Sequence, residues 1–284
     1  MIVDSHQHFW QVGCFDYPWM TPAVDVLCRD YLPPALEPML QQNGVGQTIL
    51  VQASNSIAES RWLLQLADEH GFIAGVVGWV DLQSESVTQQ LDELTAHPKF
   101  KGVRHLVESE PADDWLTQES VLKSLTELSR RDLSYDLLVH TRHLRHAHAA
   151  VERCPELRFV VDHLAKPPVE RREINEWGRE MKPFAATANV WCKLSGLVTE
   201  ANWANWQTAD FIPYVDKALE LFGPERLMFG SDWPVCLLAA SYEQVLEVLQ
   251  TLLADLSEAE RALIFGKNAS QFYRLEDEIW SAAA

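Results

Sequence analysis

The chain is short of basic residues and has no long uninterrupted apolar run, and both shortages exclude classes of protein. Its 284 residues include 23 Lys and Arg against 41 Asp and Glu, a formal net charge of −18. An acidic surface of this kind repels phosphate groups, which argues against nucleic acid or an anionic membrane as a partner. No run of about 18 apolar residues is available to cross a bilayer. The first residues also lack the basic and then apolar pattern of a secretory signal, so we expect a cytoplasmic protein.

Cysteine and glycine-rich turns are scarce as well. The five cysteines, an odd number, lie far apart, and none forms a Cys-X-X-Cys pair. This spacing indicates reduced thiols rather than a zinc ribbon or a disulfide framework. No glycine-rich turn follows an apolar run, which argues against a dinucleotide-binding open sheet.

What the sequence does contain is a repeated alternation of short apolar runs with segments of helical period. The runs predict strands near Ile2–Ser5, Thr48–Gln52, Ile73–Trp79, Gly102–Leu106, Tyr135–Val139, Phe159–Asp162, Val190–Leu194 and Leu227–Phe229. Helices are expected over Ser56–His70, Ser86–Ala96, Glu119–Arg131, Leu144–Cys154, Glu173–Thr187, Pro213–Phe222, Ser241–Leu253 and Ser257–Phe265.

About eight strand–helix units with near-continuous apolar strands predict parallel strands covered by helices. The chain has no linker-like stretch, so we expect one α/β domain over residues 1–284, a (β/α)8 barrel of the TIM type. The C-terminal helices are expected to close or flank this barrel, with Asn268–Tyr273 against its outside. A doubly wound open sheet is the alternative.

The first predicted strand leads into the sequence His6-Gln7-His8. Side chains two residues apart on a strand point to the same face, so both imidazoles are aimed into one space. A pair of metal ligands requires this arrangement, and so does a pair of groups that polarises a carbonyl. The alternative is two solvated histidines in an N-terminal turn.

Polar and aromatic side chains recur at the other strand ends. In a parallel barrel the C-terminal ends of the strands face one shared cavity. Burying ionisable groups there costs free energy unless they are paired, so their repetition indicates a functional site. The aromatic loop Gly13–Arg29 follows the first strand and is expected to cover this site. The residues concerned are Gln52, Trp79, Arg104, His105, His140, Asp162, His163, Lys193 and Asp232.

Five segments together resemble the amidohydrolase superfamily. They are Asp-Ser-His-Gln-His-Phe-Trp at 4–10, Phe-Lys-Gly-Val-Arg-His-Leu at 100–106, Phe-Val-Val-Asp-His-Leu-Ala-Lys-Pro at 159–167, Lys-Leu-Ser-Gly at 193–196 and Met-Phe-Gly-Ser-Asp-Trp-Pro at 228–234. The resemblance covers essentially the whole chain. It is most specific to the sugar-lactonase branch, typified by the L-fucono- and L-rhamnono-lactonases.

The resemblance implies a set of catalytic residues. Asp232 matches the general base that takes a proton from the attacking water, and His163 matches a histidine that hydrogen-bonds the substrate carbonyl. His6 and His8 match the pair that binds a metal or polarises the carbonyl directly. The residues expected to contact substrate are Arg104, Gln52, Lys193, Trp79 and Trp10. An alternative for Arg104 and Lys193 is a structural ion pair inside the barrel.

The expected metal ligands are His6, His8, His140 and Asp232. Members with two metals bridge them with a lysine on the fourth strand, but here Lys101 stands at the wrong end of that strand and Arg104 takes the position. The guanidinium would repel a second cation, so we expect at most one divalent metal, with zinc as the favoured identity. The resemblance also includes metal-independent lactonases, so a metal requirement stays open.

The sequence therefore predicts a lactonase that opens a sugar-acid lactone such as L-fuconolactone or a related aldonolactone. One alternative is a metal-dependent decarboxylase of the aminocarboxymuconate type, which would favour several arginines around the site. Another is a non-catalytic barrel that binds a sugar acid or a metal. Monomer and homo-oligomer both remain open.

Overall fold

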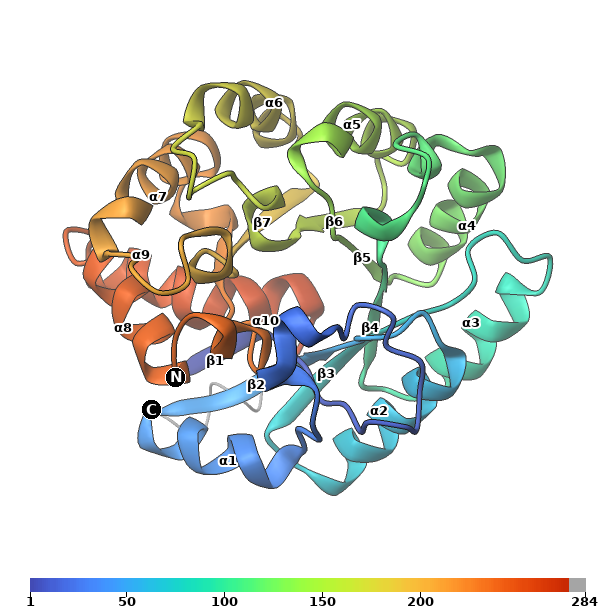
Figure 1. Cartoon of the computed structure of the whole chain (residues 1–284). Coiled ribbons are helices and arrows are strands. Elements are labelled where there is room, and N and C mark those ends of the chain that lie inside the picture. The colour runs from blue at the N-terminus through green and yellow to red at the C-terminus, as the bar shows by residue number, and fades with distance from the viewer. Residues whose placement is uncertain (276–284) are drawn as a thin grey trace.

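The computed structural model describes residues 1–275, and its centre is a ring of eight parallel strands (Figure 1). Each strand pairs with the next along the chain, in the order β1 to β8. The strands are β1 Ile2–Gln7, β2 Val45–Val51, β3 Ile73–Gly78, β4 Phe100–His105, β5 Ser134–Leu137, β6 Arg158–Val161, β7 Val190–Leu194 and β8 Leu227–Phe229. The predicted (β/α)8 barrel is confirmed. The predicted domain also includes residues 276–284, which lie outside the described residues.

Helices surround the strands on every side (Figure 1). They are α1 Pro33–Gln42, α2 Ile57–Glu69, α3 Val87–Thr95, α4 Glu119–Arg130, α5 Leu144–Arg153, α6 Ile174–Ala186, α7 Thr208–Phe222, α8 Tyr242–Leu252, α9 Glu258–Ala262 and α10 Asn268–Tyr273. Serine caps start several of them: the hydroxyl of Ser56 accepts from Glu59 N, and that of Ser241 accepts from Gln244 N.

The starts of two helices that contain proline were not predicted from the sequence. No helix was expected at α1, which begins with two prolines and contains Pro38 in its interior. The predicted start of α7 at Pro213 is wrong, because the helix begins at Thr208 and runs through this proline. Proline suits the first turn of a helix, and packing here overrides its cost at interior positions.

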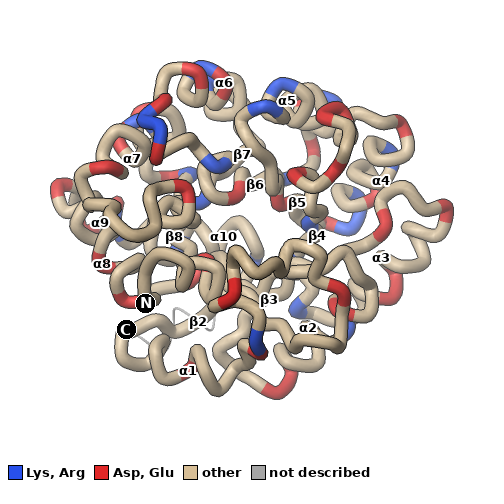
Figure 2. Tube along the Cα trace, viewed as in Figure 1, with Lys and Arg blue, Asp and Glu red and all other residues tan. Residues whose placement is uncertain are grey.

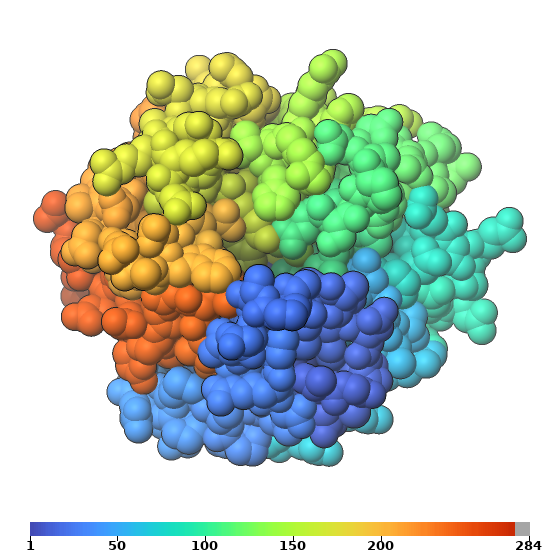
Figure 3. All heavy atoms as spheres, in the orientation of Figure 1, coloured from blue at the N-terminus to red at the C-terminus, as the bar shows by residue number. Residues whose placement is uncertain are grey.

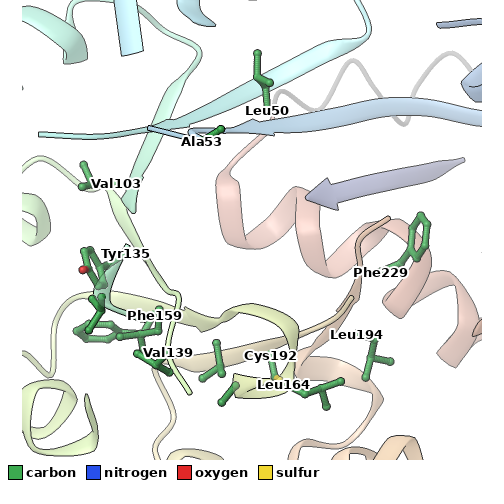
Figure 4. Close-up of a cluster of buried hydrophobic side chains, with 14 of the residues drawn as sticks. Leu50, Ala53, Val103, Tyr135, Val139, Phe159, Leu164, Cys192, Leu194 and Phe229 are labelled. Atoms are coloured by element: carbon green, nitrogen blue, oxygen red, sulfur yellow. The ribbon is translucent and has the colours of Figure 1, made fainter. Parts of the chain in front are cut away.

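Apolar side chains fill the space between the strands and the helices. Figure 4 shows part of this cluster, with Val103, Tyr135 and Phe159 on neighbouring strands. A second cluster lies inside the barrel, where side chains of the strands pack against Phe272 and Tyr273 of α10.

The position of α10 corrects the expectation that it lies outside the barrel. Backbone carbonyls at its end accept from side chains at the N-terminal ends of two strands: Arg158 donates to Phe272 O and Lys101 to Arg274 O. Tyr273 is 1% exposed, and its hydroxyl donates to Asp136 Oδ2 at 2.7 Å. The helix therefore closes the end of the barrel opposite the strand ends that carry the polar residues.

The junction between β1 and β8 is held largely by polar contacts. Ser5 Oγ donates to Phe229 O at 2.6 Å, and Asp232 N donates to His6 O at 2.8 Å. Asp4 Oδ1 accepts from Ser231 N at 2.9 Å. These contacts place the loop after the last strand directly beside the end of the first.

Charged residues are spread over the surrounding helices and loops (Figure 2). Within residues 1–275, every helix is too short or too polar to cross a bilayer.

Candidate active site

Three histidines surround the carboxylate of Asp232 at the C-terminal end of the barrel. His8 Nε2 lies 3.3 Å from Asp232 Oδ1, and the Nε2 atoms of His6 and His163 each lie 3.8 Å from it. All four residues are buried, the most open being His163 at 4%. The structure thus brings together the four residues predicted to be catalytic, from the first, sixth and eighth strand ends.

Unusual backbone conformations aim two of these side chains. Asp232 has φ = 57°, and the run His163–Lys166 has φ values of 52°, 53°, 58° and 51°. Left-handed backbone costs about 1–2 kcal/mol per non-glycine residue, so the surrounding structure must impose it. For Asp232, the hydrogen bond from its backbone N to His6 O, and the bond from the neighbouring Ser231 N to Asp4 Oδ1, supply that restraint.

The segment Lys-Leu-Ser-Gly at the end of β7 forms the support behind His163. Ser195 Oγ lies 2.8 Å from His163 Nδ1, and Ser195 is 2% exposed. Gly196 has φ = 65°, and a Cβ there would come within 2.8 Å of the His163 ring. Only glycine accommodates both the backbone conformation and this close approach.

The two strand-one histidines differ in their surroundings. His8 Nδ1 donates to Val51 O at 2.8 Å, so its Nε2 carries a lone pair toward Asp232. His6 lies between two cations, with Lys193 Nζ 3.0 Å from Nδ1 and Arg104 Nη1 3.1 Å from Nε2. Burial and the Lys193 charge hold the pKa of His6 well below its usual value.

A charged network lies beneath His6. Lys193 is fully buried, 2.6 Å from Asp136 Oδ2 and 3.0 Å from Asp162 Oδ1, and Arg104 Nη1 donates to Asp162 Oδ2 at 3.2 Å. Burial favours the neutral acid, yet Lys193 and His6 hold the pKa of Asp162 well below its usual range. The alternative role weighed for Arg104 and Lys193, an ion pair inside the barrel, is therefore present in the structure.

Asp232 keeps its charge for a similar reason. Burial raises the pKa of its carboxyl, but nearby cationic groups, His163 foremost and Lys166 among them, outweigh this effect and lower it. The site therefore holds an ionised carboxylate among imidazoles and cations, a combination that can take a proton from water and hold a developing negative charge.

A cavity of about 240 Å³ opens above this cluster. Its lining includes the proposed reacting groups and an apolar wall from the loops after β1 and β8. In Figure 3 the dark blue N-terminal segment abuts the orange and red C-terminal part on this face. The lining residues are His8, Trp10, Trp19, Val24, Leu27, Ala53, Arg104, Leu106, Glu108, Ser109, Leu138, His163, Lys166, Thr199, Asp232, Val235 and Leu238.

The residues predicted to contact substrate fall into two groups. Trp10 and Arg104 line the cavity. Gln52 and Lys193 are fully buried beneath it, where Gln52 Nε2 donates to Arg104 O at 3.2 Å. Trp79 lies outside the lining found in the described residues, and its indole N–H donates to His105 Nδ1 at 2.9 Å.

His140 does not join the predicted metal ligands. Its Nε2 lies 3.4 Å from Glu108 Oε2, its side chain is 39% exposed, and neither candidate metal group in residues 1–275 includes it. Strand β5 ends at Leu137, so His140 lies on the loop beyond the barrel rather than at the strand end.

The donor set of His6, His8 and Asp232 fits one divalent cation. The distances between their Nε2, Nε2 and Oδ1 atoms are 3.1, 3.3 and 3.8 Å, near the ~3.4 Å that separates tetrahedral ligands of zinc. The tautomer of His8 leaves the required lone pair on Nε2. The second candidate group, His6, Asp162 and His163, adjoins the Lys193 ammonium, which already supplies a positive charge.

Zinc added to chelator-treated protein is expected to bind at no more than one equivalent per chain, because Arg104 and Lys193 already occupy the remaining cation positions. Elemental analysis after gel filtration measures the ratio. His8→Ala should weaken binding, whereas His146→Ala, on α5 outside both candidate metal groups of residues 1–275, should not. A ratio of two that depends on His8 would contradict the single-site geometry.

Sequence reasoning assigned no role to Ser195, Lys166, Glu108 or Asp136. Ser195 and Lys166 could have been predicted, because they belong to two of the segments that resemble the amidohydrolases, 193–196 and 159–167. Asp136 and Glu108 gave no local signal, because their importance comes from partners more than 50 residues away.

Comparisons with known proteins agree with this geometry. The family model described as "Amidohydrolase" matches residues 3–275. An L-fucono-1,5-lactonase of Burkholderia ambifaria is 38% identical and one of Burkholderia multivorans 39%, over at least 96% of each chain. A crystal structure of an amidohydrolase from B. multivorans with bound zinc has a TM-score of 0.94 at 38% identity, covering 97% of this chain and all of that one.

Proposed function

This chain belongs to the amidohydrolase family, and we propose that it is a lactonase that hydrolyses the ester of a sugar-acid lactone such as L-fucono-1,5-lactone. The observation that carries the proposal is the convergence of three imidazoles on one ionised carboxylate at the floor of a cavity. Relatives named as lactonases along the full length support it, and the decarboxylase alternative has no comparable support.

In the proposed reaction Asp232 removes a proton from a water molecule held over the lactone carbonyl. The lowered pKa of Asp232 keeps it ionised at neutral pH, so the base is available without prior deprotonation. The water oxygen bonds to the carbonyl carbon, and the ester bond to the ring oxygen then breaks. That ring oxygen takes the proton from Asp232, and the product is an open-chain hydroxy acid.

Arg104 and His163 stabilise the negative charge that develops on the carbonyl oxygen. Both side chains line the cavity beside Asp232. When Ser195 donates to His163 Nδ1, the ring proton lies on Nε2 and points toward the cavity. Preorganised donors of this kind are worth most in a site that excludes water. A zinc ion held by His6, His8 and Asp232 would add Lewis-acid charge to the same region.

Ser195→Ala is expected to lower kcat by about 10-fold with little change in KM, because His163 loses the partner that fixes its tautomer. Steady-state kinetics on L-fucono-1,5-lactone measures the effect. Ser195→Thr keeps the hydroxyl and should recover most of the rate. Equal losses in the alanine and threonine variants would show that packing, not the hydroxyl, is what matters.

The direct test of the function is proton release from a panel of aldonolactones, followed with a pH indicator. We expect the purified protein to accelerate opening of L-fucono-1,5-lactone well above the spontaneous rate, with other ring sizes and configurations slower. A protein that leaves every lactone of the panel at its spontaneous rate is not a lactonase.

A further inference from the structure

The cavity holds a second charged group besides the reacting cluster, formed by Glu108 and Lys166. Glu108 lies in the short helix Val107–Ser109 after β4, and Lys166 ends the left-handed run that begins at His163. Lys166 Nζ donates to Glu108 Oε2. In the described part of the chain, these are the charged side chains of the cavity lining besides Arg104 and Asp232.

Both members of the pair are charged. Burial lowers the pKa of Lys166, but the carboxylates of Glu108 and Glu200 outweigh it and raise that pKa. Burial raises the pKa of Glu108, but Lys166 outweighs it and lowers that pKa. Taking such a pair out of water costs free energy, so its presence calls for a reason other than stability.

The pair is also accessible from the cavity. Its side chains are 20% and 23% exposed, in contrast to the fully buried Lys193 and Asp136. An ammonium has more protons than one carboxylate contact uses, and a carboxylate accepts more than one hydrogen bond. Glu108 and Lys166 therefore retain both a donor and an acceptor for a ligand in the cavity.

The remainder of the lining restricts what that ligand group can be. Away from the reacting cluster the wall is mostly apolar, with Trp10, Trp19 and Leu138 among its members. Lys166 stands three residues after His163 on the same turn, so a group bound at the pair is held at a fixed distance from the carbonyl. Vicinal ring hydroxyls, which both donate and accept, match a neighbouring carboxylate and ammonium.

We propose that Glu108 and Lys166 form the hydroxyl-recognition site of the cavity and select polyhydroxylated lactones over lactones that lack ring hydroxyls. This inference rests on the proposed lactonase function and adds the residues that determine its specificity. A site built to hydrogen-bond a hydroxyl rejects analogues without it, because its own polar groups are then left unpaired.

The test compares Lys166→Met and Glu108→Gln on a six-membered aldonolactone and on analogues that each lack one ring hydroxyl. On the parent lactone we expect kcat/KM to fall by about 10- to 100-fold in each variant, the loss typical of a hydrogen bond to a charged group. On the analogue without the contacted hydroxyl the loss in Glu108→Gln should shrink to less than about 3-fold, because substrate and enzyme have then lost the same contact. Lys166→Met should also lose less on this analogue than on the parent, but a common loss remains on every lactone because Lys166 helps keep Asp232 ionised.

Lys182→Met, an exposed lysine on α6, serves as the matched control and should behave as the wild type on every lactone. A variant whose loss is the same for the parent and all analogues would overturn the inference, since the pair would then act on folding or on the chemistry. If Lys166→Met does not fold, the Glu108→Gln variant alone tests the inference, because it keeps the size of the side chain. Failure of the proposed function looks different, because the wild type itself would then open no lactone.

Discussion

Asp232→Asn is expected to lower kcat on a sugar-acid lactone by about 10³-fold, the middle of the range for loss of a general base. Asparagine keeps the shape of the side chain, and the backbone contacts of residue 232 with His6 and Cys236 do not use the carboxylate. The fold should therefore persist while the proton acceptor is gone. Initial rates of proton release on L-fucono-1,5-lactone measure the loss.

The matched control for this substitution is Asp255→Asn, on an exposed loop, which should retain the wild-type rate. Thermal unfolding of the Asp232→Asn protein separates a chemical defect from a folding defect. A variant that is folded and releases protons as fast as the wild type would remove Asp232 from the mechanism. The three histidines would then need a different base.

Lys193→Met is expected to lower the free energy of unfolding by about 3–5 kcal/mol, because it leaves the buried carboxylate of Asp136 without a cation and Asp162 with Arg104 alone. Lys193 touches Asp136, Asp162 and His6 and is fully enclosed. A domain of this kind is stable by roughly 5–15 kcal/mol in total, so the loss would be a large fraction. Urea unfolding followed by circular dichroism measures it.

The control is Lys123→Met on the exposed face of α4, expected to change the stability by less than about 0.5 kcal/mol. Tyr273→Phe removes only a neutral hydroxyl donor from Asp136 and should cost less than Lys193→Met. If Lys193→Met were as stable as the wild type, the network beneath His6 would not be held together by its charge.

Periodicity sufficed to predict the barrel because strands such as β2, β3 and β6 are short apolar runs that alternate with segments of helical period. It failed where the deciding contact is remote in sequence. The start of α7 depends on packing that tolerates Pro213, and the place of α10 depends on Tyr273 reaching Asp136, 137 residues away. Neither is encoded in local pattern.

The candidate site also has features that local pattern predicts and features that depend on contacts remote in sequence. The spacing of His6, on β1, and His8, directly after it, was sufficient to predict that both rings face a common space, and the structure places Asp232 between them and His163. The depth of a side chain was not predictable from local pattern: Gln52 and Lys193 lie fully buried under the cavity, where they contact Arg104 O and His6 Nδ1. His140 was placed by analogy with a strand end, but the strand stops three residues earlier.

The β1–β8 junction also makes the position of Asp232 depend on the first strand. His6 O accepts from the backbone N of Asp232, and the Asp4 side chain accepts from the backbone N of the neighbouring Ser231. Truncation before residue 6 would therefore remove the acceptor of Ser231 N and release part of the loop that carries the base.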